Sequence, residues 1–139
     1  PLPTTLRAKA AHDTTGAEVV PLGLTMNEIA DGSWVMGIED PTGSEAAIHA
    51  KVGSTQVLAV ENRTAYAHPF HLHGFFFQPL DAAGNVIHPI ELKDTIDVPA
   101  VGRVNLAVSY DNRPGMWMFH CHILDHAETG MMGMLHVAP

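Results

Sequence analysis

Two short histidine-rich segments contain the side chains of this sequence that are best suited to bind a metal. The segments are residues 68–74 (HPFHLHG) and 120–126 (HCHILDH), and together they hold six of the ten histidines. The second segment also contains Cys121, the sole cysteine of the chain. A lone cysteine is most often a small buried apolar residue. Its position between two histidines indicates a transition-metal ligand instead, since imidazole and thiolate both bind such ions.

The alternation of side chains along a β-strand sorts these candidates into two groups. Successive side chains point to opposite faces, so the two histidines that flank Cys121 share one face and Cys121 points to the other. In residues 68–73 the last two histidines likewise share a face. The first histidine lies an odd number of positions before them, so we expect it on the opposite side. The first group is therefore His68, Cys121 and His126, and the second is His71, His73, His120 and His122.

The first group offers two imidazoles and one thiolate. With a weak thioether ligand added, this set matches the trigonal site of blue copper, in which methionine supplies a long axial bond. Met131 and Met132 are both available for that role. The spacing of cysteine, four residues, histidine, four residues and methionine favours Met131 as the axial ligand.

The second group offers four imidazoles, which leaves two interpretations open. A single zinc ion can be held by three or four histidines. A copper cluster is favoured by two features: the ligands come as His-x-His pairs, and two of them are covalent neighbours of Cys121. The two metal centres would then share one covalent path through the backbone.

These segments, together with residues 62–64 (NRT) and 93–95 (KDT), resemble the C-terminal cupredoxin domain of the multicopper oxidases. That family includes laccases, bilirubin oxidase, ascorbate oxidase and bacterial cuprous oxidases, and the resemblance covers nearly the whole chain. It implies a copper-binding oxidoreductase in the periplasm or outside the cell. The ligands that it implies are His68, Cys121, His126 and Met131 for a type 1 copper, His71 for a type 2 copper, and His73, His120 and His122 for two type 3 coppers.

The resemblance also implies a direction of electron flow. A small reductant would give electrons to the type 1 copper, and Cys121 would pass them to His120 and His122. Dioxygen would be reduced to water at the trinuclear cluster of type 2 and type 3 coppers. Family members complete that cluster with four further histidines from an N-terminal cupredoxin domain. This chain would therefore need such a domain as a separate chain or as part of its parent protein.

The remaining histidines do not supply the missing ligands. They are scattered singly, and we expect them on the surface or in loops: His12, His49, His88 and His136. The acidic residue that helps deliver protons in many bacterial relatives is replaced by Ala127. One alternative function is thus an isolated electron-transfer cupredoxin that holds a single copper and has no oxidase activity. Another is adventitious binding of copper or zinc by the four outward histidines.

Short alternating stretches between turn residues predict the fold that positions these side chains. The pattern is typical of about eight strands with turns at roughly 8–12-residue spacing, and contains no long helix. We expect an all-β protein, a Greek-key sandwich or barrel of the cupredoxin type. The metal-binding segments lie on a long strand expected over 70–80 and on a strand over 116–122, which a helical turn over 123–126 follows. Residues 1–16 are expected to form a linker or N-terminal arm, and residues 17–139 the domain with the type 1 site.

Composition argues against several other classes of protein. The 139 residues are 46% hydrophobic and 16% charged, which is typical of a compact fold. The net charge of −8 argues against a nucleic-acid partner, and no run of about 18 or more apolar residues is present to span a membrane. Four methionines of the expected strands are predicted to pack in the core and at its rim rather than to form a soft surface for Cu(I): Met116, Met118, Met132 and Met134.

Overall fold

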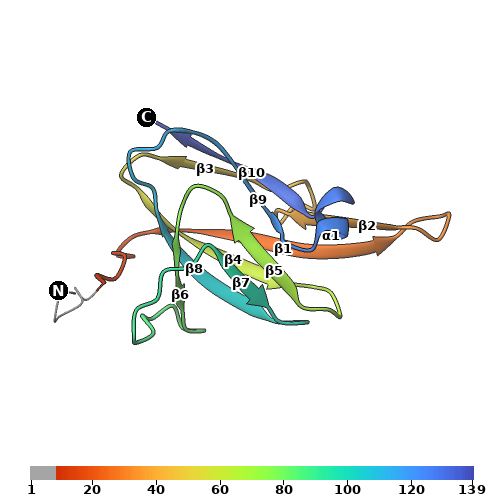
Figure 1. Ribbon diagram of the computed structural model, residues 1–139, viewed down its shortest axis with the longest axis horizontal. Coiled ribbons are helices and arrows are strands. Elements are labelled where there is room, and N and C mark those ends of the chain that lie inside the picture. The colour runs from red at the N-terminus through yellow and green to blue at the C-terminus, as the bar shows by residue number, and fades with distance from the viewer. Residues whose placement is uncertain (1–8) are drawn as a thin grey trace, which may run out of the picture.

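Two five-stranded sheets face each other in the computed structural model, which describes residues 9–139 (Figure 1). The first sheet has the strand order β2-β1-β4-β8-β6 and the second has the order β3-β10-β9-β5-β7. The elements in chain order are β1 (Glu18–Glu28), β2 (Trp34–Glu39), β3 (Ala47–Lys51), β4 (Thr55–Asn62), β5 (His68–Leu72), β6 (Phe77–Leu80), β7 (Thr95–Val98), β8 (Arg103–Ser109), β9 (Gly115–Cys121), α1 (Leu124–Glu128) and β10 (Met132–Ala138). This architecture confirms the expected all-β sandwich, with ten strands in place of about eight.

The core lies between the sheets and follows the alternation of apolar and polar residues along the strands. Leu106 on β8 is fully buried in the first sheet. Phe70 on β5 and Phe119 on β9 are fully buried in the second, with ring centroids 6.0 Å apart. Tyr110, just after β8, is buried and donates a hydrogen bond of 2.9 Å to Gln56 Oε1. Burial raises the pKa of Tyr110, so its hydroxyl stays protonated and keeps this bond.

The strand order brings distant parts of the chain together. β1 pairs with β4 and β3 pairs with β10 in parallel, whereas the other pairs are antiparallel. β5 and β9 are therefore neighbours although they lie far apart in the sequence. The β1–β2 hairpin projects from one end of the sandwich beside α1 (Figure 1), where the Met36 N–H donates to the Thr129 carbonyl at 3.2 Å. The histidine-rich segments thus lie on the central strands of the second sheet and on the short helix that follows them.

Residues 70–80 do not form one long strand, contrary to the expectation from sequence. β5 ends at Leu72 in the second sheet and β6 begins at Phe77 in the first. Between them Gly74 has a φ of +78°, a conformation that favours glycine. A Cβ at this position would overlap the indole of Trp117. The chain crosses between the sheets here, because Gly74 permits both the turn and the close approach of the tryptophan.

Two smaller elements also differ from expectation. The sequence pattern predicts no strand over residues 47–51, where β3 alternates buried Ile48 and Ala50 with exposed neighbours. The helical turn expected over 123–126 is the helix α1, Leu124–Glu128. Within residues 9–139, no helix is long and apolar enough to cross a membrane.

The N-terminal arm contacts the sandwich where the structure describes it. Residues 1–8 of the expected linker lie outside the described residues, and β1 begins at Glu18. The backbone N–H of His12 donates to Gln78 Oε1 on β6 at 2.8 Å. This contact ties the segment before β1 to the first sheet. The domain boundary at residues 16 and 17 stays a prediction.

Replacing Gly74 with alanine should destabilise the protein by about 2–5 kcal/mol, the sum of two costs. A left-handed residue with a Cβ costs roughly 1–2 kcal/mol, and displacing the Trp117 indole adds about 1–3 kcal/mol of overpacking. Gly84→Ala is the matched control, since Gly84 also has a positive φ (+87°) but has no atom within 4 Å of its added Cβ. Urea unfolding measures both free energies. Equal losses in the two variants would contradict a specific contact between Gly74 and Trp117.

Candidate metal centres

Strands β5 and β9 run antiparallel in the second sheet and carry most of the candidate ligands. His71 lies opposite His120, and Phe70 lies opposite Cys121. Directly opposite residues project to the same face. The two histidines therefore point to the outer face of the sheet, whereas Phe70 and Cys121 point into the core. His68 is an odd number of residues from His71 and is fully buried.

The inward-facing side chains form a compact triangle of possible ligand atoms. His68 Nδ1 lies 3.1 Å from His126 Nδ1, and Cys121 Sγ lies 3.8 Å from the first nitrogen and 3.6 Å from the second. Met131 is fully buried, accepts the Cys121 N–H at 3.0 Å and donates to the His126 carbonyl at 2.9 Å through its backbone. The structure therefore brings the first expected group together and places Met131, rather than the half-buried Met132, in the core beside it.

This donor set fits one transition-metal ion. Imidazole and thiolate ligands lie about 2.0–2.3 Å from a bound ion, so donor atoms separated by 3.1 to 3.8 Å can share one. The soft thiolate suits Cu(I), and imidazole also suits Cu(II). The combination tolerates both oxidation states of copper, which a one-electron carrier requires.

Burial favours the neutral forms of His68 and Cys121. It lowers the pKa of His68, and charge repulsion from His126 lowers that pKa further. Burial raises the pKa of the Cys121 thiol, an effect that the backbone N–H of Ile123 partly offsets. The thiolate is the form that binds metal, so an incoming ion must displace the thiol proton. The neutral imidazole already has a lone pair to offer.

The outward-facing histidines form a second cluster on the opposite side of β9. His73 Nε2 lies 3.0 Å from His120 Nε2, and possible ligand nitrogens of His71, His73 and His120 all lie within 4.8 Å of one another. His122 stands beside this trio, with its ring centroid 5.4 Å from that of His71 and 6.0 Å from that of His120. Burial and the neighbouring imidazoles lower the pKa of His73. All four expected side chains thus share one face, with His122 at its edge.

Hydrogen bonds at Nδ1 orient two of these rings. His71 Nδ1 lies 2.9 Å from the Asp94 carbonyl oxygen and 2.9 Å from Thr95 Oγ1. A carbonyl oxygen can only accept, so Nδ1 carries the proton and Nε2 is free to bind a metal. His120 Nδ1 donates in the same way to the Cys121 carbonyl at 2.7 Å. Asp94 and Thr95 belong to the KDT segment, to which the sequence alone assigned no role.

The other histidines lie outside both clusters. His49 and His136 are exposed, but they lie on β3 and β10 rather than in loops, and the pairing of these strands places their ring centroids 6.1 Å apart. His88 is exposed in the loop between β6 and β7. His12 is half-buried, and burial lowers its pKa. Among residues 9–139, the groups of three or more metal-binding side chains are therefore the two described above.

Four methionines extend the outer face beyond the histidine cluster, and of the expected packing in the core and at its rim, none of the four lies in the buried core. Met132 lies opposite His120, and Met134 lies opposite Met118. Met116 is 60% exposed, and the other three are half-buried. The parity that turns His120 outward also turns every second residue of β9 and β10 outward. The outer face of the second sheet is thus rich in thioethers as well as imidazoles.

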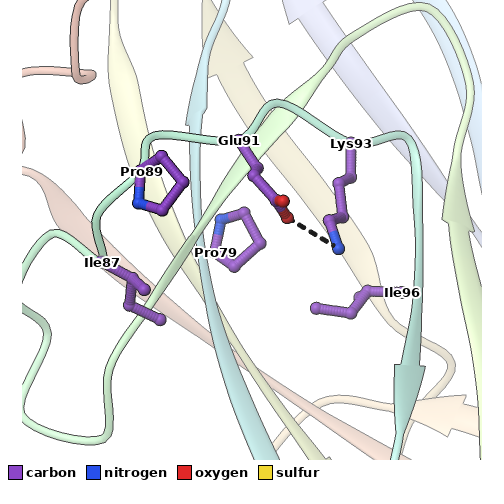
Figure 2. Close-up of a pocket in the computed structure, with 6 residues that line it drawn as sticks. All are labelled: Pro79, Ile87, Pro89, Glu91, Lys93 and Ile96. Atoms are coloured by element: carbon purple, nitrogen blue, oxygen red, sulfur yellow. Dashed lines mark ion pairs between the residues drawn. The ribbon is translucent and has the colours of Figure 1, made fainter.

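An apolar depression of about 300 Å³ between β6 and β7 contains none of the clustered side chains (Figure 2). Its lining is Pro79, Ile87, Pro89, Glu91, Lys93 and Ile96. Glu91 and Lys93 pair with each other at 3.0 Å, so each charge there has its partner. A separate depression of about 260 Å³ is bordered by His71 and His73. The histidine face, rather than the apolar depression, is therefore the candidate site.

Known proteins resemble this chain over nearly its whole length. Residues 14–139 match the family described as multicopper oxidase. The chain is 34% identical over 125 residues to multicopper oxidase MmcO of Mycobacterium tuberculosis, which covers 90% of this chain and 22% of that protein. It is 26% identical over 144 residues to a laccase of Haloferax volcanii, which covers 95% of this chain and 24% of that protein. The chain thus spans less than a quarter of the length of these relatives.

Solved structures share the same arrangement of strands. McoA multicopper oxidase from Aquifex aeolicus superposes with a TM-score of 0.75 at 26% identity, over 94% of this chain and 31% of that one. A multi-copper oxidase from Pseudomonas thermotolerans gives a TM-score of 0.71 at 31% identity, over 99% and 34% of the two chains. Fold, ligand chemistry and sequence relatives agree, and this copper-binding oxidoreductase domain belongs to the multicopper oxidase family.

Proposed function

We propose that this chain takes up electrons at a type 1 copper and delivers them to a trinuclear copper cluster that it shares with a partner domain. When bound, copper supplies one-electron redox chemistry at the first site and the reduction of dioxygen to water at the second. The proposed type 1 ligands are His68, Cys121, His126 and Met131, and the proposed cluster ligands are His71, His73, His120 and His122.

The observation that carries this proposal is the back-to-back placement of the two ligand sets on β9. Cys121 points inward to His68 and His126, whereas its neighbour His120 points outward to the cluster. An electron that reaches the Cys121 sulfur has an unbroken path of covalent bonds to the imidazoles of His120 and His122. The hydrogen bond of 2.7 Å from His120 Nδ1 to the Cys121 carbonyl adds a second connection and holds the ring in place.

Differences in burial among the inward ligands support electron entry at His126. His68, Cys121 and Met131 are at most 2% exposed, so water and reductants do not reach them. His126 lies on α1 at the surface and is half-buried. A reductant can therefore approach the first site most closely through this imidazole. The other three side chains keep the site dry, which strengthens electrostatic interactions with the ion.

The open histidine face supports the need for a partner domain. Four imidazoles and a strip of half-buried methionines lie together on the outer face of the second sheet. This chain covers only 22% and 31% of two relatives, so their remaining length can supply further ligands. We infer that an N-terminal cupredoxin domain, in the parent protein or in a separate chain, covers this face and completes the cluster.

A single-copper electron-transfer protein is the second candidate function. It is favoured by the contrast between the two sites within residues 9–139: the inward set has its four expected ligands, whereas the outward set has half of the eight histidines that the family uses. The two functions differ in copper stoichiometry. An oxidase complex needs about four coppers with its partner domain, and an electron-transfer protein needs one and consumes no oxygen.

Cys121→Ser should abolish intense visible absorption of the copper-loaded chain. That absorption arises from charge transfer between thiolate and copper, and a hydroxyl cannot supply it. His136→Ala removes an exposed imidazole outside both clusters and should leave the spectrum unchanged. Optical titration with copper measures both variants. A blue colour that survives in Cys121→Ser would show that the type 1 assignment is wrong.

Met131→Leu should keep the copper and its colour but raise the reduction potential, because a weak donor to Cu(II) is removed. Met132→Leu is the matched control on the outer face. It should cost less than about 1.5 kcal/mol of stability, as a near-isosteric replacement, and should leave the potential unchanged. Redox titration of the visible band measures the potential. The reverse outcome would identify Met132 as the axial ligand.

The copper-loaded chain alone should not reduce dioxygen at an enzymatic rate. Three coppers each need two or three protein ligands, and the outward cluster offers four imidazoles. Oxygen uptake with a generic one-electron donor, measured at several protein concentrations, tests this expectation. Uptake that appears only at high concentration would point to a cluster assembled between two copies. Uptake by a proven monomer would contradict the half-cluster altogether.

A further inference from the structure

Three buried polar side chains form a continuous chain of hydrogen bonds that ends on His68. Asn62, Thr64 and His68 are exposed by only 1%, 5% and 0%. Thr64 Oγ1 lies 2.8 Å from Asn62 Oδ1 and 2.6 Å from His68 Nε2. The other ring nitrogen of His68 faces Cys121 and His126. Buried polar groups must satisfy one another, so the position of each hydrogen follows from its neighbours.

The amide of Asn62 has one orientation that its neighbours allow. Its Nδ2 lies 2.7, 3.1 and 3.0 Å from the carbonyl oxygens of Tyr66, Val98 and Pro99. Its Oδ1 accepts the backbone N–H of Thr64 at 2.9 Å. A flipped amide would set its oxygen against three oxygens and its NH₂ against an N–H. Asn62 Oδ1 is therefore an acceptor, and it faces the Thr64 hydroxyl.

The Thr64 hydroxyl has one hydrogen and two oxygen neighbours that only accept. These are Asn62 Oδ1 at 2.8 Å and the Tyr66 carbonyl at 3.1 Å. The hydroxyl donates to one of them and accepts the N–H of His68 Nε2. Donation to His68 instead would leave Thr64 Oγ1 facing Asn62 Oδ1 with no hydrogen between them, which is costly for buried oxygens.

We propose that Asn62 and Thr64 position His68 as a copper ligand by fixing its tautomer, an inference that rests on the type 1 function proposed above. The proton stays on Nε2, and the lone pair of Nδ1 points toward Cys121 Sγ and His126 Nδ1 before any metal binds. Metal-binding histidines commonly donate their second N–H to a protein acceptor, which orients the ring and raises its basicity. Here the acceptor is the Thr64 hydroxyl, which donates its own hydrogen to another oxygen.

This relay, Asn62 to Thr64 to His68, distinguishes the two imidazoles of the first site. Within residues 9–139, the polar contacts of the His126 ring are at Nδ1 alone, and His126 is half-buried on α1. His68 is fully buried and held at both nitrogens. His68 is thus the preorganised ligand, whereas His126 can adjust its ring to the ion.

Thr64→Val keeps the shape of the side chain and removes the acceptor for His68 Nε2–H. The Cu(I) affinity of the chain should fall about 10- to 100-fold, as is typical when a residue that orients a metal ligand is lost. Thr64→Ser should restore the affinity. Thr25→Val is the matched control, since it removes another buried hydroxyl, bonded to Glu39 Oε1 at 3.0 Å, and should leave the affinity unchanged. Competition with a chromophoric Cu(I) chelator measures all four proteins.

NMR of the metal-free chain tests the tautomer directly. Long-range ¹H–¹⁵N spectra should place the His68 proton on Nε2 in the wild-type chain and in Thr64→Ser. In Thr64→Val they should show a mixture of the two neutral tautomers, with the proton on Nε2 in some molecules and on Nδ1 in others. A wild-type proton on Nδ1, or a Thr64→Val variant with unchanged tautomer and affinity, would overturn the proposal. A copper-loaded wild-type chain without intense visible absorption would instead refute the type 1 function. The metal-free spectrum would still decide the tautomer.

Discussion

Strands β5 and β9 pair in one register, with His71 opposite His120 and Phe70 opposite Cys121. This register decides to which face of the sheet each candidate ligand on the two strands points. A slip of one residue turns each side chain of a strand to the other face. It would carry Cys121 out of the core and His120 into it. Phe70 and Phe119 oppose such a slip, because each is fully buried and its exposure costs about 1.5–3 kcal/mol. Core packing thus maintains the register that separates the two candidate metal centres.

The two faces of β9 give the two sites different environments. The inner site is dry, and burial favours the neutral forms of His68 and Cys121 before metal binds, since it lowers the pKa of His68 and raises that of Cys121. The outer cluster is open to solvent and is oriented by carbonyl groups of its own sheet and of the neighbouring loop, as at His71 and Asp94. One strand therefore carries a buried set of candidate ligands on one face and an open set on the other.

Gly74 lies where the chain passes from the second sheet to the first, and it links the outward histidine cluster to the core. His73 lies on the outer face, and two residues later Phe75 is buried. Its ring centroid lies 5.5 Å from that of Trp117 and 5.2 Å from that of Tyr110. Phe75, directly after the histidine segment, is consequently held against two aromatic rings. This packing limits the movement of His73 relative to the ligands on β9.

The sequence by itself determined the ligand types and their division between two faces, because alternation along a strand is a local property. Residues 120–122 separate into outward and inward side chains whatever lies beside them. The tertiary structure decided the rest: the break between β5 and β6, the strand pairing that sets Met132 opposite His120, and the hydrogen bonds that orient His68 and His71. These features depend on which strands become neighbours and on contacts between residues far apart in the chain. The approach of His68 Nδ1 to within 3.1 Å of His126 Nδ1 is one such contact, since only the folded chain brings β5 and α1 together.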